Sequence, residues 1–231
     1  MSSRIFCAVD TADFNTAKNL ARGLAGHVAG LKLGLEFFAS HGPQGYKALA
    51  MQGPPVFLDL KFMDIPNTVA NAVTALLPLR PDFISIHAGG GPAMIRAAAD
   101  AAAAGGADRP KILAVTVLTS LNDADLNAVG IPDNPAAQAL RLARLSKESG
   151  ADGVVSSPAE VAQLREACGK DFILMVPGIR PVGSDKGDQK RVMTPKDAVA
   201  AGADYVVIGR PITGAPDPLA MAKAINSQIG S

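Results

Sequence analysis

The sequence predicts a closed (β/α)8 TIM barrel, an α/β fold in which eight parallel strands alternate with eight helices. Short apolar runs rich in β-branched residues recur along the chain, and each is followed by a stretch with helical periodicity. Eight such pairs in 231 residues leave about 29 residues for each strand–helix unit, which is the usual size. Alternation of this kind favours a parallel sheet, and eight units favour its closure into a barrel.

The expected elements follow one another without a linker, so residues 1–231 should form a single barrel domain. An open doubly wound sheet is the alternative, but no GxGxxG follows the first strand. The expected helices lie at about 13–25, 36–51, 66–77, 92–104, 134–149, 158–168, 195–201 and 217–228. The expected strands are Ile5–Asp10, Val28–Gly34, Val56–Lys61, Asp82–His87, Ile112–Leu118, Gly153–Ser156, Phe172–Val176 and Tyr205–Gly209.

The composition excludes several classes of protein. With 48% hydrophobic and 19% charged residues, the chain can bury a core and is not disordered. A net charge of +1 gives no general attraction to nucleic acid or to an anionic membrane. Aromatic residues make up only 4%, and there is no tryptophan, so a surface that stacks bases is not expected.

The cysteines and the N-terminus predict a cytoplasmic protein. Cys7 and Cys168 are far apart in the sequence and belong to no CxxC motif or Cys/His cluster, which argues against a disulfide framework and a zinc site. Two free thiols fit a reducing compartment. Neither a secretory signal nor an apolar run of about 18 residues is visible, so no membrane partner is expected.

The strongest functional signal is the run from Asp59 to Thr68, which reads DLKFMDIPNT. The period of two in a strand places Asp59 and Lys61 on one face and the aliphatic residues on the other. In a barrel, these two side chains would point inward at the carboxyl end of the strand, where active sites of this fold lie. Asp64 follows in the loop, and Pro66 suits the first turn of the next helix.

A structural ion pair between Asp59 and Lys61 is the alternative interpretation. The preceding strands argue against it, because the first ends in Asp10 and the second carries Lys32 between two leucines. Four charged residues would then meet at one rim of the barrel. Removing each charge from water costs several kcal/mol, so a functional site explains this set of charged residues better than a contribution to stability does.

A second signal lies at the ends of the seventh and eighth strands, where the chain reads Gly178-Ile-Arg180 and Gly209-Arg210. Barrels often bind phosphate with these two loops, since glycine lets a backbone N–H approach an oxyanion and arginine binds phosphate oxygens with two N–H groups. The polar loop 178–193 is a candidate lid whose Gln189 would cap the phosphate, and a plain surface loop is the alternative.

The sequence does not decide the roles of three further residues. His87 ends the fourth strand, where a structural hydrogen-bonded histidine is favoured over a functional one. Thr119 and Ser120 follow the fifth strand. Either would hydrogen-bond a heterocycle or cap the turn.

Taken together, these motifs resemble the orotidine 5′-monophosphate (OMP) decarboxylase family, in its bacterial type. The resemblance rests on the Asp59–Thr68 run, on Pro177-Gly-Ile-Arg180-Pro and on Gly187-Asp-Gln189, and it extends from Asp10 to Arg210. It implies a barrel homodimer that needs neither metal nor organic cofactor and converts OMP to UMP and CO₂ in pyrimidine biosynthesis.

The resemblance also implies a role for each matching position. Lys61 would be the proton donor within an alternating charged set of Lys32, Asp59, Lys61 and Asp64, in which Asp64 reaches the partner's site and Thr68 joins it at the interface. Substrate would be held through the ribose by Asp10 and Lys32, and the remaining substrate contacts would be Asp59, Asn67, Thr68, Thr119 or Ser120, Arg180, Gln189, Gly209 and Arg210.

The reaction explains why such residues are needed. Loss of CO₂ from C6 leaves an electron pair in the plane of the ring, which the ring carbonyls cannot delocalise. A nearby cation that also supplies a proton is therefore required, and Lys61 offers both, with neighbouring carboxylates that favour its charged form.

Three rival hypotheses remain at this point. A metal-dependent sugar-phosphate decarboxylase or aldolase would share the Asp-x-Lys-x-x-Asp pattern but needs a divalent ion. A Schiff-base aldolase would use Lys61 or Lys32 as a nucleophile. A non-catalytic protein that binds phosphoribosyl ligands would bind UMP-like molecules without turnover.

Overall fold

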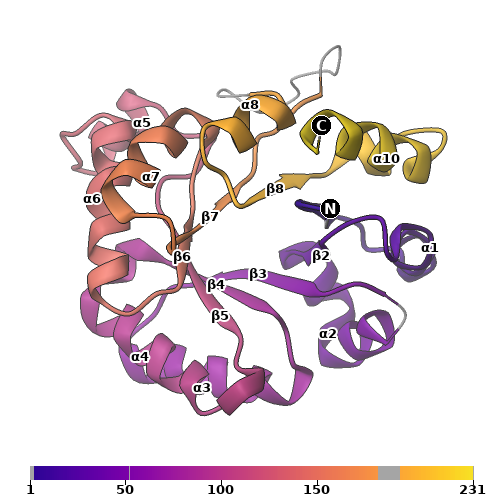
Figure 1. The fold of residues 1–231 in the computed structure, drawn as a ribbon. Coiled ribbons are helices and arrows are strands. Elements are labelled where there is room, and N and C mark those ends of the chain that lie inside the picture. Colours follow the sequence, from indigo (N-terminus) through magenta and orange to yellow (C-terminus); the bar gives the residue numbers. More distant parts are fainter. Residues whose placement is uncertain (1–2, 52, 182–192, 231) are drawn as a thin grey trace.

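The computed structural model describes residues 3–51, 53–181 and 193–230. Its eight strands are all parallel and form a closed barrel in chain order, because β1 pairs with both β2 and β8. The predicted barrel is therefore confirmed, and Figure 1 shows the helices arranged around the strands. The strands are β1 (Ile5–Val9), β2 (Gly30–Leu33), β3 (Val56–Phe62), β4 (Phe83–His87), β5 (Lys111–Val115), β6 (Gly153–Val155), β7 (Ile173–Val176) and β8 (Tyr205–Ile208).

Several helices start where a capping side chain is followed by proline. Asn134, Thr194 and Asp217 each accept a backbone N–H bond from the first turn, and a proline occupies the next position. Pro66 likewise opens α3, as predicted. The helices are α1 (Phe14–Leu24), α2 (Leu35–Ala50), α3 (Pro66–Leu76), α4 (Gly91–Ala103), α5 (Asp123–Ala128), α6 (Pro135–Glu148), α7 (Val161–Cys168), α8 (Pro195–Ala200), α9 (Arg210–Thr213) and α10 (Pro218–Ile229), with 3₁₀ turns at Leu77–Leu79, Ala88–Gly90, Gly106–Asp108 and Pro158–Glu160.

The observed elements differ from the expected ones in the loops. The short helices α5 and α9 follow β5 and β8 and were not predicted. A reciprocal capping box between Asn122 and Asp125 explains why α5 forms. Helix α2 starts and ends one residue earlier than expected and is kinked at Gly42, whose φ is 57°, just before Pro43.

The core consists of two apolar layers, one inside the barrel and one between the barrel and its helices. Along β3, Val56, Leu58 and Leu60 belong to the outer layer, whereas Phe57 belongs to the inner one. This alternation is the one that the period of two predicted. Inside the barrel the rings of Phe6, Phe57, Phe83 and Tyr205 pack edge to face, with centroids 5.2 to 6.4 Å apart.

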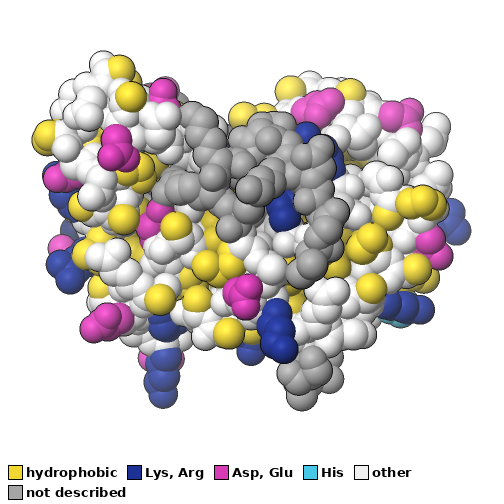
Figure 2. Space-filling model, turned by 90° about the horizontal axis from the view of Figure 1, so that it is seen from above, with side chains coloured by type: hydrophobic (Ala, Val, Ile, Leu, Met, Phe, Trp, Pro, Cys, Tyr) yellow, Lys and Arg dark blue, Asp and Glu magenta, His cyan; other side chains and the backbone are white. Residues whose placement is uncertain are grey.

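Charged side chains of both signs share the visible surface (Figure 2). On the face seen in Figure 2, the coloured atoms show acidic and basic side chains interspersed rather than gathered by sign. Among the described helices, none combines the length and the apolar character that crossing a bilayer would require.

Candidate active site

A cavity of about 490 Å³ opens at the carboxyl ends of the strands, where this fold places its active sites. Its walls come from the ends of every strand except β4. Most of the residues singled out in the sequence meet there. These are Asp10, Lys32, Asp59, Lys61, Thr119, Arg180, Gly209 and Arg210.

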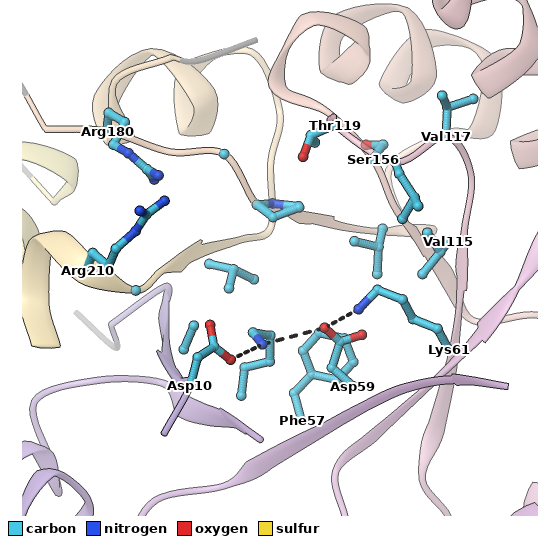
Figure 3. A pocket seen from close by; sticks show the side chains of 18 residues that line it. Asp10, Phe57, Asp59, Lys61, Val115, Val117, Thr119, Ser156, Arg180 and Arg210 are labelled. Atoms are coloured by element: carbon cyan, nitrogen blue, oxygen red, sulfur yellow. Dashed lines mark hydrogen bonds and ion pairs between the residues drawn. The ribbon is translucent and has the colours of Figure 1, made fainter. Parts of the chain in front are cut away.

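Four charged side chains form a continuous row along one wall of the cavity (Figure 3). Lys32 Nζ lies 3.0 Å from Asp10 Oδ1 and 3.6 Å from Asp59 Oδ2. Lys61 Nζ lies 2.7 Å from the same Asp59 oxygen. The three strands β1, β2 and β3 are neighbours in the barrel, so adjacent strand ends supply the alternating charges.

Asp59 is the centre of the row and its most buried member, with 6% of its surface exposed. Burial by itself raises the pKa of the Asp59 carboxyl. Lys32, Lys61 and the hydrogen bonds from Lys61 and Ser85 outweigh that effect, so the pKa lies below its ordinary value. Asp59 is therefore a carboxylate at neutral pH and holds both lysines beside it.

Strand β3 departs from regular geometry at the point where it enters the site. The predicted period of two holds as far as Asp59, but Lys61 has a φ of 52°, in the left-handed region that residues other than glycine rarely adopt. The pairing with β4 shifts between Leu58 and Phe62. Lys61 still reaches the cavity, so the predicted placement of its side chain stands, although the strand is bulged there.

Arg180 and Arg210 lie at the opposite end of the cavity and converge on the same space (Figure 3). Arg180 follows β7 and Arg210 follows β8, so neighbouring strand ends again provide them. Gly178 also lines this end and has a φ of 78°, a conformation that glycine adopts without strain. Two guanidinium groups that face one cavity suit a dianionic group such as a phosphate.

Other predicted residues lie outside the cavity of this chain. Asp64, Asn67 and Thr68 are exposed near the start of α3, and Asp64 accepts a 2.6 Å bond from the backbone N–H of Ile65. Ser120 is exposed and does not line the cavity, whereas Thr119 does. Gln189 and most of the candidate lid lie outside the described residues.

His87 has a structural contact. Its Nδ1 accepts a 3.2 Å bond from the backbone N–H of Gly89, at the start of the 3₁₀ turn after β4. Burial, and to a lesser extent the charge of Lys61, lower the pKa of His87. The neutral ring is thereby favoured, as an acceptor in such a cap must be.

Sequence reasoning missed two serines at the site. Ser156 follows β6, lines the cavity and is buried. Ser85 lies in the middle of β4, and its hydroxyl bonds to both Asp59 and Lys61. A single serine in or beside an apolar strand forms no recognisable sequence motif. Only their position at a strand end or opposite a charged residue would have drawn attention to them.

The described residues contain no group of three or more histidine, cysteine, aspartate or glutamate side chains placed to hold a metal ion. Asp59 is also fully engaged, because one of its oxygens accepts a bond from Ser85 and the other faces two ammonium groups. The charged row therefore presents the ammonium groups of Lys32 and Lys61 to the cavity.

Comparisons with known proteins match nearly the whole chain to one family. The sequence model of the "Orotidine 5'-phosphate decarboxylase / HUMPS family" matches residues 3–225. The chain is 49% identical over 231 residues to the orotidine 5′-phosphate decarboxylase of Moorella thermoacetica, covering 98% of this chain and 92% of the relative. It is 50% identical over 230 residues to that of Rhodospirillum rubrum, covering 97% of this chain and 93% of the relative.

A solved structure shows the same architecture. The crystal structure of orotidine 5′-phosphate decarboxylase from Lactobacillus acidophilus superposes with a TM-score of 0.86 at 41% identity, and the match covers 100% of both chains. Family, relatives and fold agree over nearly the full length. This chain therefore belongs to the orotidine 5′-phosphate decarboxylase / HUMPS family.

Proposed function

We propose that this protein is a cytoplasmic OMP decarboxylase, which converts OMP to UMP and CO₂ in de novo pyrimidine biosynthesis. The observation that carries the proposal is the Lys61 ammonium, held 2.7 Å from the Asp59 carboxylate in a cavity with two arginines at its other end. The relatives named above bear the same activity in their names. The free thiols of Cys7 and Cys168 suit a reducing compartment.

The cavity offers a contact for each part of the nucleotide. Arg180, Arg210 and the backbone at Gly209 bind the phosphate. Asp10 and Lys32, near the middle of the cavity, bind the ribose hydroxyls, and Thr119 meets the pyrimidine. This orientation directs C6 of the ring toward Lys61, because the two arginines lie at the opposite end (Figure 3).

The chemical step needs only the nucleotide and the lysine. The bond between C6 and the carboxylate carbon breaks and CO₂ departs. The electron pair of the broken bond stays on C6. The Lys61 ammonium stabilises that pair and then transfers a proton to C6, which leaves UMP and a neutral lysine that regains its proton from water. A cation fixed in a largely desolvated site stabilises developing negative charge far more than one in water does.

Loss of absorbance when OMP is added to EDTA-treated protein tests both the activity and its independence of metals. Full activity after EDTA treatment is expected. Activity that disappears with EDTA and returns with a divalent ion would favour the metal-dependent rival. Borohydride that traps substrate on Lys61 or Lys32 would favour the Schiff-base aldolase. UMP binding without turnover would favour the non-catalytic protein.

The exposed loop after β3 supports a homodimer with shared sites. Met63 and Ile65 are 58% and 66% exposed, and they flank Asp64 at the mouth of the barrel. Exposed apolar side chains around an acidic residue suit a contact with a second copy of the chain. In this proposal Asp64, with Thr68, completes the charged set of the partner's site, and Asn67 joins the substrate contacts.

Hybrid dimers test the shared site. One subunit carries Lys61→Ala and the other Asp64→Ala, so that one of the two sites keeps both residues. Each parent homodimer should be nearly inactive, and verified heterodimers should recover up to half of the wild-type activity per dimer. Heterodimers as inactive as their parents would contradict the arrangement.

A further inference from the structure

The pairing of β3 with β4 contains a bulge at the charged row. Leu58 pairs with Ile84, and the next pair joins Phe62 to Ile86, so β3 advances four residues while β4 advances two. Ser85 is the single β4 residue between these pairs. Three residues of β3 therefore lie opposite one serine, and two of the three are the charged residues of the site.

The hydroxyl of Ser85 bonds to one backbone group and one side chain of the bulged segment. It accepts a 2.9 Å bond from the backbone N–H of Lys61 and donates a 2.8 Å bond to Asp59 Oδ1. Ser85 is completely buried. A serine hydroxyl has one donor and two acceptor positions, so a single atom satisfies both partners without water.

These two bonds act on two groups that help to place the Lys61 ammonium, namely the carboxylate that it contacts and the backbone that carries it. The bond to Oδ1 sets the rotation of the Asp59 carboxylate, which leaves Oδ2 facing Lys32 and Lys61. The bond to the N–H holds the backbone of Lys61 in the left-handed conformation, which is unfavourable for a side-chain-bearing residue. Strained backbone at a site persists only where surrounding contacts determine it.

We propose that Ser85 is a positioning residue for decarboxylation. Its hydroxyl holds the Lys61 ammonium at the place from which it can reach the reacting carbon. The inference rests on the proposed function. Ser85 does not line the cavity. It acts only through Asp59 and the backbone of Lys61, so its loss should lower turnover far more than it weakens nucleotide binding, which depends mainly on the arginine end.

The separation between turnover and binding tests this role. In Ser85→Ala, Lys61 loses its fixed geometry while the arginine end is unchanged. We expect kcat for OMP to fall at least thirtyfold, and the Kd of UMP, measured by calorimetry, to change less than threefold. Ser85→Cys keeps nearly the same shape with a much weaker donor and acceptor, and its kcat should fall at least fivefold.

Ser146→Ala is the matched control. Ser146 is also completely buried, and its hydroxyl donates a 2.7 Å bond, but to the carbonyl of Leu142 within α6. This variant removes an equivalent hydrogen bond far from the charged row, so its kcat should stay within twofold of the wild-type value. A loss of kcat equal to that of Ser85→Ala would show a general packing effect and overturn the inference.

The remaining outcomes are distinct. If the wild-type protein does not decarboxylate OMP, the proposed function fails, and the role of Ser85 fails with it. If the wild type is active and Ser85→Ala keeps its kcat within threefold, only the role of Ser85 is refuted. Weakening of UMP binding in proportion to kcat would also refute it. If Ser85→Ala does not fold, the Ser85→Cys variant decides the matter by itself. A wild-type kcat in that variant would refute the role of Ser85.

Discussion

The two ends of the cavity are built in different ways. At the end formed by β1, β2 and β3, the side chains of Lys32 and Asp59 are only 12% and 9% exposed and are interlocked by ion pairs. At the end formed by β7 and β8, Arg210 is exposed and Arg180 is half-buried. Lys32 and Asp59 are therefore largely removed from water before any ligand arrives, whereas Lys61 beside them is 30% exposed and Arg210 at the other end is exposed.

This difference matches the work proposed for each end. A group that must stabilise charge appearing during a reaction is most effective when it is already fixed and water is already excluded. A phosphate brings its own charge, so the arginines that meet it need not be buried before it binds. Removing charges from the two ends should accordingly affect turnover at one end and affinity at the other.

Lys61→Ala should have the largest effect, because it removes both the cation and the proton donor. We expect kcat to fall on the order of 10⁴-fold or more, since acid catalysis and electrostatic stabilisation are lost together. The affinity for UMP should change by less than about tenfold. Absorbance assays and calorimetry measure the two quantities, with the exposed Lys47→Ala on α2 as the control. Near wild-type turnover would refute the proposed mechanism.

Asp59→Asn should lower kcat about 10²-fold, because the lysines lose the carboxylate that holds them. The variant should also change how stability depends on pH. The pKa of Asp59 is depressed in the folded state, so its stabilising contribution is present above the ordinary carboxyl pKa of 3.8 and is lost as the pH falls through the lower folded value.

Urea unfolding of Asp59→Asn across that acid range is the matching measurement. In the wild type, the free energy of unfolding should decrease as the pH falls below about 4, and the variant should show a smaller decrease. Identical pH profiles would mean that Asp59 does not carry the stabilising charge.

Arg210→Ala should act mainly on binding. Loss of a charge-assisted hydrogen bond of about 2 kcal/mol corresponds to a roughly thirtyfold weaker affinity for UMP. The kcat at saturating OMP should change less than the affinity does. Arg144→Ala, an exposed arginine on α6, serves as the control. Unchanged UMP affinity in Arg210→Ala would contradict the phosphate assignment.

Thr119→Ala should have the smallest measurable effect, a roughly fivefold rise in KM, because one neutral hydrogen bond to the ring is lost. Ser120→Ala should leave KM unchanged, since Ser120 is exposed and does not line the cavity. The reverse pattern in steady-state kinetics would assign the pyrimidine contact to Ser120.

Much of this arrangement could be predicted because it depends on local patterns. The apolar runs and helical periods indicated all eight strands and the barrel, and the charged residues at the strand ends indicated the cavity. Closure of a parallel barrel brings successive strand ends together by necessity. The meeting of Asp10, Lys32 and Asp59 therefore follows once the strands are recognised.

The rest depends on contacts that no local pattern encodes. The bulge in β3 arises where the hydroxyl of Ser85, 24 residues further along, accepts the N–H of Lys61. A short helix such as α9, with four residues, has too little periodicity to detect. The roles of Asp64 and Thr68 depend on a second chain and remain predictions.

The aromatic rings inside the barrel limit the routes by which a small molecule can leave the cavity. Phe57 forms part of the floor of the cavity, while Phe6, Phe83 and Tyr205 line a second cavity at the amino ends of the strands. The edge-to-face layer separates the two and closes the barrel axis. Under the proposed mechanism, the aromatic layer lies between Lys61 and the amino ends of the strands, so we expect CO₂ to leave through the mouth at the carboxyl ends, where the nucleotide would also enter.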